Sequence, residues 1–430
     1  MSKWLIIFED DRFDYFYPLT YLRPVYFLRP GIRALYEKVI DNFPGYKSFL
    51  FCRPEIAAVT SEMTHISVNH VDEDKAEEVI LINGRLRLSA DFAAALNAAG
   101  KNAFLTSGGN VAAIKVVGGL TLDEQNDLNN GELGAFADKI RRRSEALDVE
   151  IPFYQYLWEM VNAIDQELAD DFEFLRKQTG ERIKELELEV TTGKASSLYP
   201  GVHFINPGSI YAARDAELLP GSVIDASKGP IFIGTGARIE PYTYLIGPAY
   251  LGKDSILVGG RIAGSSIGPV CRVGGELEET IIQGYSNKYH AGFIGHSYIG
   301  EWVNLGAMTT NSDLKNNYSA VRVSVKGKEI DTGSMKVGSF IGDFTKTAIG
   351  TLLNTGINIG IVCNIVSDGV VADKEIPSFT WYSSRHRIDY QVVKAIETIR
   401  RTMSRRGKEL SPQLSVLLTE ISRLKSEKKE

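Results

Sequence analysis

Branched aliphatic residues recur every six positions through the second half of the chain. The longest runs are Ile233, Ile239, Leu245, Leu251 and Leu257, and then Ile341, Thr347, Leu353, Ile359, Ile365 and Val371. A period of six matches neither the helical period of about 3.6 nor the simple alternation of a strand. It predicts coils of short strands that each place one side chain inward, stacked into one continuous apolar column. The alternative, a glycine-rich antiparallel sandwich, does not predict this spacing.

Glycine is concentrated in the same region. Residues 201–370 hold 27 of the 40 glycines, and several follow an aliphatic position directly, as after Ile233, Leu251 and Ile267. A turn at such a point needs a left-handed or crowded backbone that a Cβ atom opposes. Residues 311–336 break the period, which predicts a loop or arm that leaves the column.

The first 150 residues alternate short apolar runs with segments of helical length. Strands are expected at 5–8, 48–51 and 78–82, and helices at 31–43 and 91–100. Strands separated by helices predict an α/β domain with a parallel sheet over residues 1–150. A helical connector is expected over 151–194, because Leu157, Val161 and Ile164 share one helix face.

The column is expected over residues 195–378, and a helical tail over 379–430. Residues 385–430 carry twelve Lys or Arg and six Asp or Glu. Acidic residues are interspersed among the basic ones, so packing on the acidic body or capping of the open column explains the tail better than binding to nucleic acid or membrane.

Composition narrows the classes of function. Of the 430 residues, 44% are hydrophobic and 24% charged, and the net charge is −6. This excludes a mainly disordered or collagen-like chain, and it argues against nucleic-acid binding. The three cysteines lie far apart, with neither a disulfide framework nor a zinc-site spacing. The start is not a signal peptide and no apolar run reaches about 18 residues, so we expect a cytoplasmic protein without a membrane span.

Two strings connect the column to a known family. GPVCR (268–272) and NKYHAGFIGHSYIGEWVNLGAMTTN (287–311) resemble the GlmU-like family of bifunctional sugar-1-phosphate nucleotidyltransferases and glucosamine-1-phosphate N-acetyltransferases. The resemblance implies a left-handed parallel β-helix of hexapeptide repeats and acetyl-CoA as a co-substrate. It also implies a homotrimer with active sites between neighbouring β-helices.

The resemblance also implies roles for single residues. His290 matches the catalytic base, and histidine suits that role because its ordinary pKa lies near working pH. Arg272 matches a residue that contacts the sugar phosphate, Asn304 one that orients the substrate, and Ala307 one near the acetyl donor. Asn311 matches a further substrate-binding residue across a shortened loop.

Three positions depart from the family pattern. The substrate-binding lysine falls at Glu278 and a tyrosine at Phe293. Either another cation, for which Lys288 is a candidate, replaces the lysine, or the acceptor differs from glucosamine-1-phosphate. Met308 is bulkier than the family's glycine and is a candidate for narrowing the substrate slot. We expect His296 to be a solvent-facing turn residue.

The first domain resembles a sugar nucleotidyltransferase opening at PLTYLRPV (18–25). The preceding loop EDDRFDYFY (9–17) has no glycine, the family's lysine falls at Val25, and Arg85 stands near the place of a metal-binding aspartate.

The candidates for nucleotide or phosphate binding are Arg12, Arg23, Asn83 and Gly84. Guanidinium groups match phosphate oxygens, although the arginines could equally pair with nearby acids. Asp10 and Asp11 could hold Mg²⁺ or form a solvated loop, so the metal ligands stay open.

The sequence therefore predicts a transferase of sugar-nucleotide biosynthesis, on the route to UDP-N-acetylglucosamine and the cell envelope. The β-helix would acetylate a phosphorylated amino sugar, and the first domain could transfer a nucleotidyl group from UTP or dTTP to a sugar-1-phosphate. The alternatives are a nucleotidyltransferase only, or a decayed trimeric scaffold that binds sugar nucleotides.

Overall fold

The structure is a computed structural model that describes residues 2–71, 76–100, 102–177, 199–213, 215–383 and 386–427. The chain divides into two units. The first contains residues 1–16, 22–28 and 33–155, and the second contains residues 17–21, 29–32 and 156–430. The helices expected in the connector therefore belong to the second unit, and residues 178–198 of that connector lie outside the described part.

The first unit is built on a seven-stranded sheet in the order β3-β2-β1-β4-β6-β5-β7. Its strands are β1 (Lys3–Phe8), β2 (Lys47–Phe51), β3 (Ser67–Val68), β4 (Glu78–Asn83), β5 (Asn102–Ser107), β6 (Asn110–Val117) and β7 (Glu145–Asp148). β1 pairs in parallel with β2 and β4, whereas β6 is antiparallel to β4 and β5. Leu5, Ile6 and Ile7 are all buried, so both faces of β1 are covered. The three strands expected from the sequence are confirmed within this mixed sheet.

The helices of the first unit connect these strands. They are α1 (Leu35–Asn42), α2 (Pro54–Met63), α3 (Ala90–Ala98), α4 (Leu122–Asn129) and α5 (Leu133–Arg141). α1 begins at Leu35 rather than at residue 31. Ala34 precedes it in an extended conformation, and its backbone N–H donates to the Glu37 carboxylate at 2.6 Å.

The four residues before Arg33 belong to the second unit instead. The backbone N–H of Ile32 donates to Asp171 Oδ2 at 2.8 Å, and Ser266 Oγ donates to the Gly31 carbonyl at 2.6 Å. A Cβ atom at Gly31 would lie 2.6 Å from Asp171 Oδ2, so only glycine fits there. These contacts explain why the helix does not start at residue 31.

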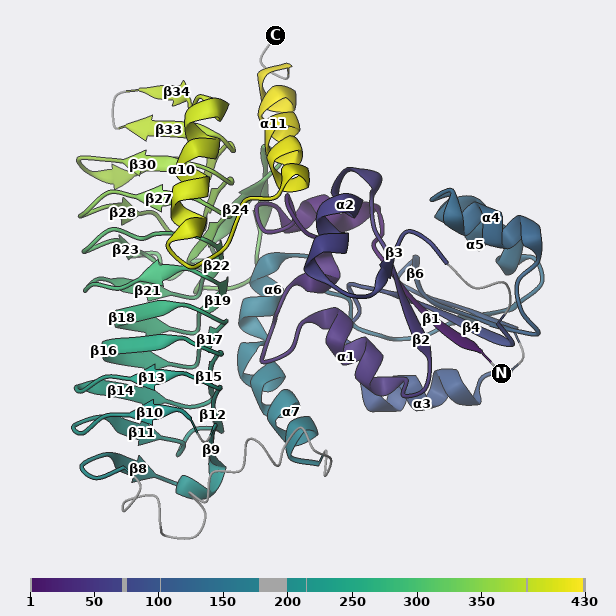
Figure 1. Ribbon diagram of the computed structural model, residues 1–430, viewed down its shortest axis with the longest axis horizontal. Coiled ribbons are helices and arrows are strands. Elements are labelled where there is room, and N and C mark those ends of the chain that lie inside the picture. The colour runs from purple at the N-terminus through teal and green to yellow at the C-terminus, as the bar shows by residue number, and fades with distance from the viewer. Residues whose placement is uncertain are drawn as a thin grey trace. The chain divides into compact units, whose positions relative to one another are not determined.

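The second unit is a parallel β-helix (Figure 1). One face is the sheet of β9 (Ile210–Ala212), β12 (Ile231–Ile233), β15 (Ala249–Leu251), β17 (Ser266–Ile267), β19 (Ile281–Gly284), β22 (Tyr298–Glu301), β26 (Ser339–Ile341), β29 (Ile357–Ile359) and β32 (Glu375–Ile376). Successive strands of this face pair in parallel, so each coil stacks directly on the one before it.

The other faces are formed in the same way. Their strands are β8 (His203–Ile205), β10 (Glu217–Leu218), β11 (Val223–Asp225), β13 (Arg238–Ile239), β14 (Thr243–Ile246), β16 (Ile256–Ala263), β18 (Arg272–Glu278), β20 (Asn287–Lys288), β21 (Phe293–Gly295), β23 (Thr310–Asn311), β27 (Lys346–Thr347), β28 (Leu352–Leu353), β30 (Asn364–Val366), β31 (Val370–Val371) and β33 (Thr380–Ser383). The pairing confirms the predicted β-helix and excludes the antiparallel sandwich.

The side chains that recur every six residues form the core of this column. Every aliphatic residue of the two long runs belongs to one buried cluster, together with Ile267, Val273, Ile299 and Leu305. Thr347 is the polar member of the period, and it is buried with its hydroxyl 2.7 Å from that of Thr309. The glycines after the aliphatic positions are explained by crowding, because a Cβ atom at Gly268 would lie 2.1 Å from the Gln283 carbonyl oxygen.

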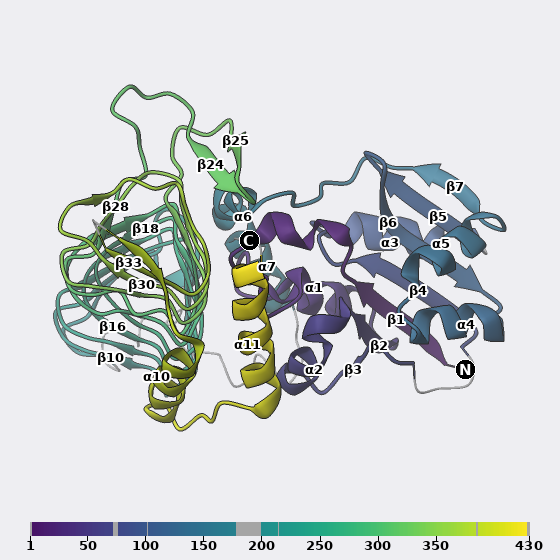
Figure 2. The same cartoon turned by 90° about the horizontal axis from the view of Figure 1, so that it is seen from above.

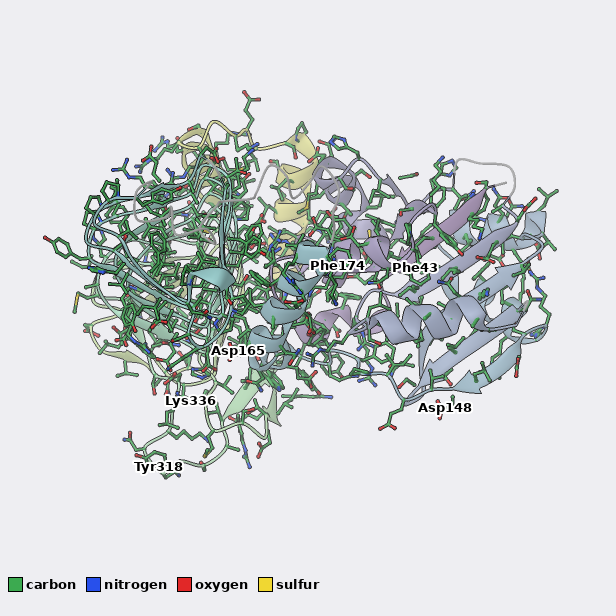
Figure 3. All side chains as sticks on the ribbon, turned by 90° about the horizontal axis from the view of Figure 1, so that it is seen from below. Phe43, Asp148, Asp165, Phe174, Tyr318 and Lys336 are labelled. Carbon is green, nitrogen blue, oxygen red and sulfur yellow. The ribbon has the colours of Figure 1, made fainter. Side chains whose placement is uncertain are left out.

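Helices and a hairpin accompany the column. They are α6 (Leu157–Asn162), α7 (Ile164–Lys177), α10 (Val392–Ser404), α11 (Pro412–Glu427), and the antiparallel hairpin of β24 (Arg322–Val325) and β25 (Lys328–Asp331). The hairpin lies outside the ring of coils, as expected for the arm at 311–336 (Figure 2). Tyr318, 68% exposed, lies at the far end of this arm (Figure 3). β34 (Arg387–Asp389) pairs with β33 and leads into α10.

Candidate functional site

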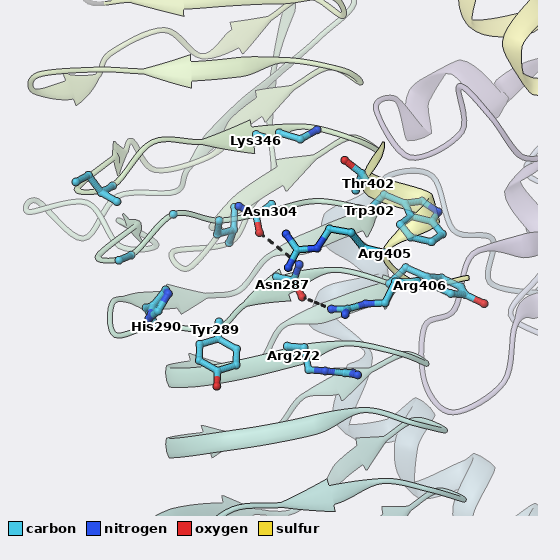
Figure 4. A pocket seen from close by; sticks show the side chains of 15 residues that line it. Arg272, Asn287, Tyr289, His290, Trp302, Asn304, Lys346, Thr402, Arg405 and Arg406 are labelled. Atoms are coloured by element: carbon cyan, nitrogen blue, oxygen red, sulfur yellow. Dashed lines mark hydrogen bonds between the residues drawn. The ribbon is translucent and has the colours of Figure 1, made fainter. Parts of the chain in front are cut away.

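A cavity of about 610 Å³ opens on the side of the β-helix (Figure 4). It is lined by Arg272, Tyr285, Asn287, Tyr289, His290, Trp302, Asn304, Leu305, Gly306, Ala307, Lys346, Ile349, Thr402, Arg405 and Arg406. Most of these residues come from neighbouring coils, and the last three come from the end of α10 and the residues after it. The cavity therefore joins the column to the tail within one unit.

A polar strip runs along one wall of the cavity. Arg272 pairs with Asn287, Asn287 with Asn304, and Asn304 with Lys346, each at the same register on successive coils. Neighbouring strands are about 4.8 Å apart, so these four side chains form a ladder. Asn287 Nδ2 donates to Asn304 Oδ1 at 3.3 Å, which orients the two amides in the middle of the strip.

His290 and Ala307 come after this strip along the chain. Each lies three residues after a ladder asparagine, Asn287 and Asn304 respectively, on neighbouring coils. His290 is exposed, and its ring meets the ring of Tyr289 edge-on at 5.1 Å. The structure thus brings together Arg272, His290, Asn304 and Ala307, the four residues to which the resemblance gives the central roles.

Lys288 and Asn311 lie elsewhere. The Lys288 ammonium is buried and donates to the carbonyls of Gly274 (2.8 Å) and His290 (2.7 Å), and burial lowers its pKa to about 8. Asn311 is buried and exchanges hydrogen bonds with the backbone of Gly295 at 2.9 and 3.0 Å. Both side chains hold the coils together and neither lines the cavity, although Lys288 positions the turn that carries His290.

The sequence did not reveal the contribution of the tail. Arg406 Nη2 donates to Asn287 Oδ1 at 3.0 Å, and Arg405 lines the same cavity. Burial, together with the charges of Arg272 and Arg405, lowers the pKa of Arg406. The available signal was the basic tail with arginine pairs at 400–401 and 405–406. Nothing in the sequence shows which pair turns toward the column.

Lys346 completes the cations of the cavity. Its ammonium donates to the Phe344 carbonyl at 3.1 Å, and burial lowers its pKa to about 8. Arg272 donates to the carbonyls of Asp254 and Cys271, both at 2.9 Å. Among the described residues that line the cavity, none carries a carboxylate. The wall is therefore positively charged and suits an anionic ligand.

Glu278 and His296 lie away from the cavity, and Glu278 ends β18, the strand that begins at Arg272. Glu278 pairs with Arg261 at 3.0 Å and with Lys336 at 3.5 Å, and it is not among the lining residues. The expectation that His296 faces solvent is wrong. His296 is 4% exposed, with Nε2 2.9 Å from the Glu279 carboxylate and Nδ1 2.7 Å from that of Asp313.

The two carboxylates make this burial of His296 possible. Although burial alone lowers the pKa of His296, the hydrogen bonds that its ring donates to the carboxylates of Asp313 and Glu279, together with their charges, raise it to about 9. His296 is therefore a buried cation in neutral solution, held between two negative groups. Its role is structural, and it does not line the cavity.

The opening of the first unit is arranged differently. Arg85 is fully buried and binds Asp10 with two hydrogen bonds, Nε to Oδ1 at 2.8 Å and Nη2 to Oδ2 at 2.6 Å. Asn83 Nδ2 donates to the same carboxylate at 2.8 Å. Burial opposes ionisation of Asp10, but the hydrogen bonds and charge of Arg85 hold its pKa below the usual value.

The other predicted phosphate ligands are dispersed. Arg12 is exposed, with its guanidinium 5.6 Å from the centre of the Tyr15 ring, whereas Arg23 is 2% exposed. The Gly84 N–H donates to the Phe8 carbonyl at 2.8 Å, and a Cβ atom there would lie 2.6 Å from the Tyr26 ring.

Asp10, one of the two carboxylates predicted for Mg²⁺, is already engaged by a guanidinium. Within the described ranges, no three His, Cys, Asp or Glu side chains are grouped to hold a metal. Arg85 thus neutralises the Asp10 carboxylate, whereas Asp11 is exposed.

Known proteins resemble different parts of this chain. Residues 5–179 match the family described as sugar nucleotidyl transferase. The chain is 34% identical over 156 residues to a bifunctional sugar-1-phosphate nucleotidylyltransferase/acetyltransferase of Sulfurisphaera tokodaii, covering 34% of this chain and 37% of the relative. It is 27% identical over 281 residues to the bifunctional protein GlmU of Trichormus variabilis, covering 60% of this chain and 54% of the relative.

A solved structure of an Arabidopsis UDP-N-acetylglucosamine acyltransferase also aligns, with 13% identity, over 51% of this chain and 88% of that chain. Its TM-score is 0.24, so the β-helix assignment rests on the strand pairing above. The chain spans about a third to a half of the length of the curated relatives it matches. The GlmU-like resemblance is confirmed, and the named relatives are transferases. Among the described helices, none has the length and apolar character to cross a membrane.

Proposed function

We propose that the β-helix cavity transfers an acetyl group from acetyl-CoA to the amino group of a phosphorylated amino sugar similar to glucosamine-1-phosphate. The supporting observation is that Arg272, His290, Asn304 and Ala307 line one cavity. The product would serve sugar-nucleotide biosynthesis, on the route to UDP-N-acetylglucosamine and the cell envelope. The expected ligands are phosphorylated sugars, nucleotides and acetyl-CoA, and the proposed location is cytoplasmic.

The chemistry requires one proton to be moved. The sugar nitrogen attacks the thioester carbonyl, a C–N bond forms, and the C–S bond to coenzyme A breaks. His290 takes the proton that the nitrogen loses and returns it to the departing thiolate. The wall of the cavity holds the two substrates so that the nitrogen meets the carbonyl, which removes much of the entropic barrier.

Asn304 is suited to stabilise the oxygen on which charge develops. Its Oδ1 accepts from Asn287 at 3.3 Å, so its Nδ2 is the atom left to donate to a substrate oxygen. A donor fixed before the reaction stabilises a developing oxyanion more than one that must reorient. Ala307 keeps the adjacent backbone open to the acetyl group because its side chain is small.

A homotrimer is part of the proposal. Large apolar side chains are exposed on the β-helix, namely Tyr242, Met308, Ile349, Leu352, Val366 and Val370. Ile349 is 78% exposed and also lines the cavity. A neighbouring copy that covers Ile349 would bury apolar surface and close the open side of the site. Light scattering of the purified chain measures this state.

The test is release of coenzyme A from acetyl-CoA in the presence of amino-sugar phosphates. We expect His290→Ala to lower kcat by about 10²- to 10⁴-fold, the range typical of a lost general base. His203→Ala is the matched control, because His203 is an exposed histidine on β8 of the same β-helix. Unchanged turnover in His290→Ala would exclude the proposed role of the imidazole.

Nucleotidyl transfer in the first unit is the second candidate function, favoured by the family match over residues 5–179. Release of pyrophosphate from UTP or dTTP with a sugar-1-phosphate measures it. If this assay alone is positive, the chain is a nucleotidyltransferase only. If both assays are negative while sugar nucleotides still bind, the decayed scaffold is the correct alternative.

A further inference from the structure

The cavity gathers four permanent or potential cations on one wall. Arg272 and Lys346 stand at the two ends of the ladder, and Arg405 and Arg406 approach it from the tail. Figure 4 shows the tail arginines beside Asn287 and Asn304, with His290 on the other side of these asparagines. Like charges repel one another, and the described lining residues supply no carboxylate to offset them.

The tail therefore changes how the missing family lysine is understood. Glu278 occupies the lysine position and is engaged by Arg261 and Lys336. Lys288, the replacement expected from the sequence, points its ammonium at two backbone carbonyls instead. Neither residue places a cation in the cavity, whereas the residues that follow α10 place two there, Arg405 and Arg406.

We infer that Arg405 and Arg406 are phosphate-binding residues of this cavity, which Arg272 and Lys346 also line, and that they bind a phosphate group carried by one of the transferase substrates. Guanidinium groups bind phosphate oxygens through paired N–H donors, which suits a mobile ligand that must be held in one register. Arg406 is already fixed by its hydrogen bond to Asn287 Oδ1, so little freedom is lost when the ligand enters.

A simpler explanation for arginines at this point is the helix itself. Basic residues near a helix C-terminus interact favourably with its dipole, and Arg405 comes directly after α10. That explanation applies equally to Arg401, which lies in the last turn of α10. It does not account for two arginines that line one cavity with Arg272, or for the hydrogen bond from Arg406 to Asn287.

The inference rests on the proposed function for the identity of the ligand. Two substrates of acetyl transfer carry phosphate, the amino sugar and coenzyme A. Calorimetric binding to the full chain separates them, with glucosamine-1-phosphate in one arm and coenzyme A in the other. Glucosamine and 3′-dephospho-coenzyme A, which lack one phosphate each, serve as matched ligands.

The variants are Arg405→Gln, Arg406→Gln and the double substitution, with Arg400→Gln as the control. Arg400 is an exposed arginine of α10 that does not line the cavity, so its change in charge equals that of each single variant. We expect the double variant to raise the Kd of one or both phosphate ligands at least tenfold. Arg400→Gln should change it less than twofold. Arg405→Lys with Arg406→Lys should recover part of the affinity, and unchanged thermal unfolding shows that the variants are folded.

Each outcome of the binding measurements either supports or overturns the phosphate-binding role of Arg405 and Arg406. A rise confined to glucosamine-1-phosphate assigns the arginines to the acceptor, and a rise confined to coenzyme A assigns them to the donor. Both support the inference, as does a rise for both. Equal effects in the control, an unchanged Kd, or no binding of either ligand to the parent chain would overturn it. Because binding needs no proton transfer, unchanged turnover in His290→Ala would overturn the proposed function alone and would leave the phosphate-binding inference standing.

Discussion

Arginines lie both at the opening of the first unit and in the cavity of the β-helix, where the sequence suggests phosphate binding. They are paired with carboxylates in the first unit and lie beside other cations in the cavity. In the first unit, Arg85 binds Asp10 and Arg53 binds Glu9, each at 2.6–2.8 Å. In the β-helix, Arg405 and Arg406 face other cations. A guanidinium is available to a ligand only where no carboxylate has already claimed it.

Burial explains the difference. Arg85 is fully buried, and removing a charge from water costs several kcal/mol unless a partner repays it. Arg405 is exposed and Arg406 half-buried, so water still solvates them until a ligand arrives. Arg85 is therefore a structural cation, whereas the solvent-accessible Arg405 and Arg406 suit the phosphate-binding role inferred for them.

The largest expected effect tests the structural half of this comparison. Arg85→Ala should lower the free energy of unfolding of the first unit by about 3–5 kcal/mol, because it leaves Asp10 partly buried without its counter-charge. Urea unfolding measures it. Arg12→Ala, an exposed arginine two residues from Asp10, should stay within about 0.5 kcal/mol of the parent. Equal stability of the two variants would contradict the structural role of Arg85.

A smaller effect is expected on phosphate binding in the cavity, and it is tested by the dependence of the Kd on pH. Lys346 has a pKa lowered to about 8 by burial, so the free chain loses this cation as the pH rises through 8. The phosphate is already dianionic above pH 7, and the arginines stay charged. We expect the Kd of the phosphate ligand to rise by up to about tenfold between pH 7 and 9, measured by calorimetry.

Lys346→Met is the control for this profile. Its affinity should be lower at pH 7 and should fall less than that of the parent up to pH 9, because the Lys346 ammonium is gone while Lys288, whose pKa is also about 8, remains. A parent profile as flat as that of Lys346→Met would place the ligand away from Lys346 and leave the arginines as the cations that matter.

The sequence predicts the column far better than the site. A six-residue period has one inward-facing position per strand, so the sequence alone predicts which residues are buried. The structure buries Ile233, Leu251 and Ile359 as predicted. The string around His290 identifies one wall of the cavity for the same reason, since the regular coils fix where the residues next to Asn287 and Asn304 lie. Here local pattern and tertiary position are the same information.

What the sequence missed or predicted wrongly depends on contacts between residues that lie apart in the sequence. Arg406 lies 119 residues from Asn287, and no local pattern records that they meet. Lys288 lies in the matched string, yet its ammonium turns to the carbonyls of Gly274 and His290. His296 looks like a turn residue until Glu279 and Asp313 are seen on either side of it. Side-chain direction and counter-charge are tertiary properties.

The smallest expected effect asks whether bulk, rather than charge, sets the selectivity of the cavity. Met308 stands where the resemblance has glycine, adopts a left-handed φ of 62° and is 57% exposed. It does not line the cavity. We expect Met308→Gly to leave KM for both substrates within about twofold in the coenzyme A release assay. Its stability should also change little, because relief of about 1 kcal/mol of backbone strain is offset by the greater freedom of glycine in the unfolded chain. A fall in KM of tenfold would show that the methionine narrows a substrate slot, and the cation set alone would then not define the site.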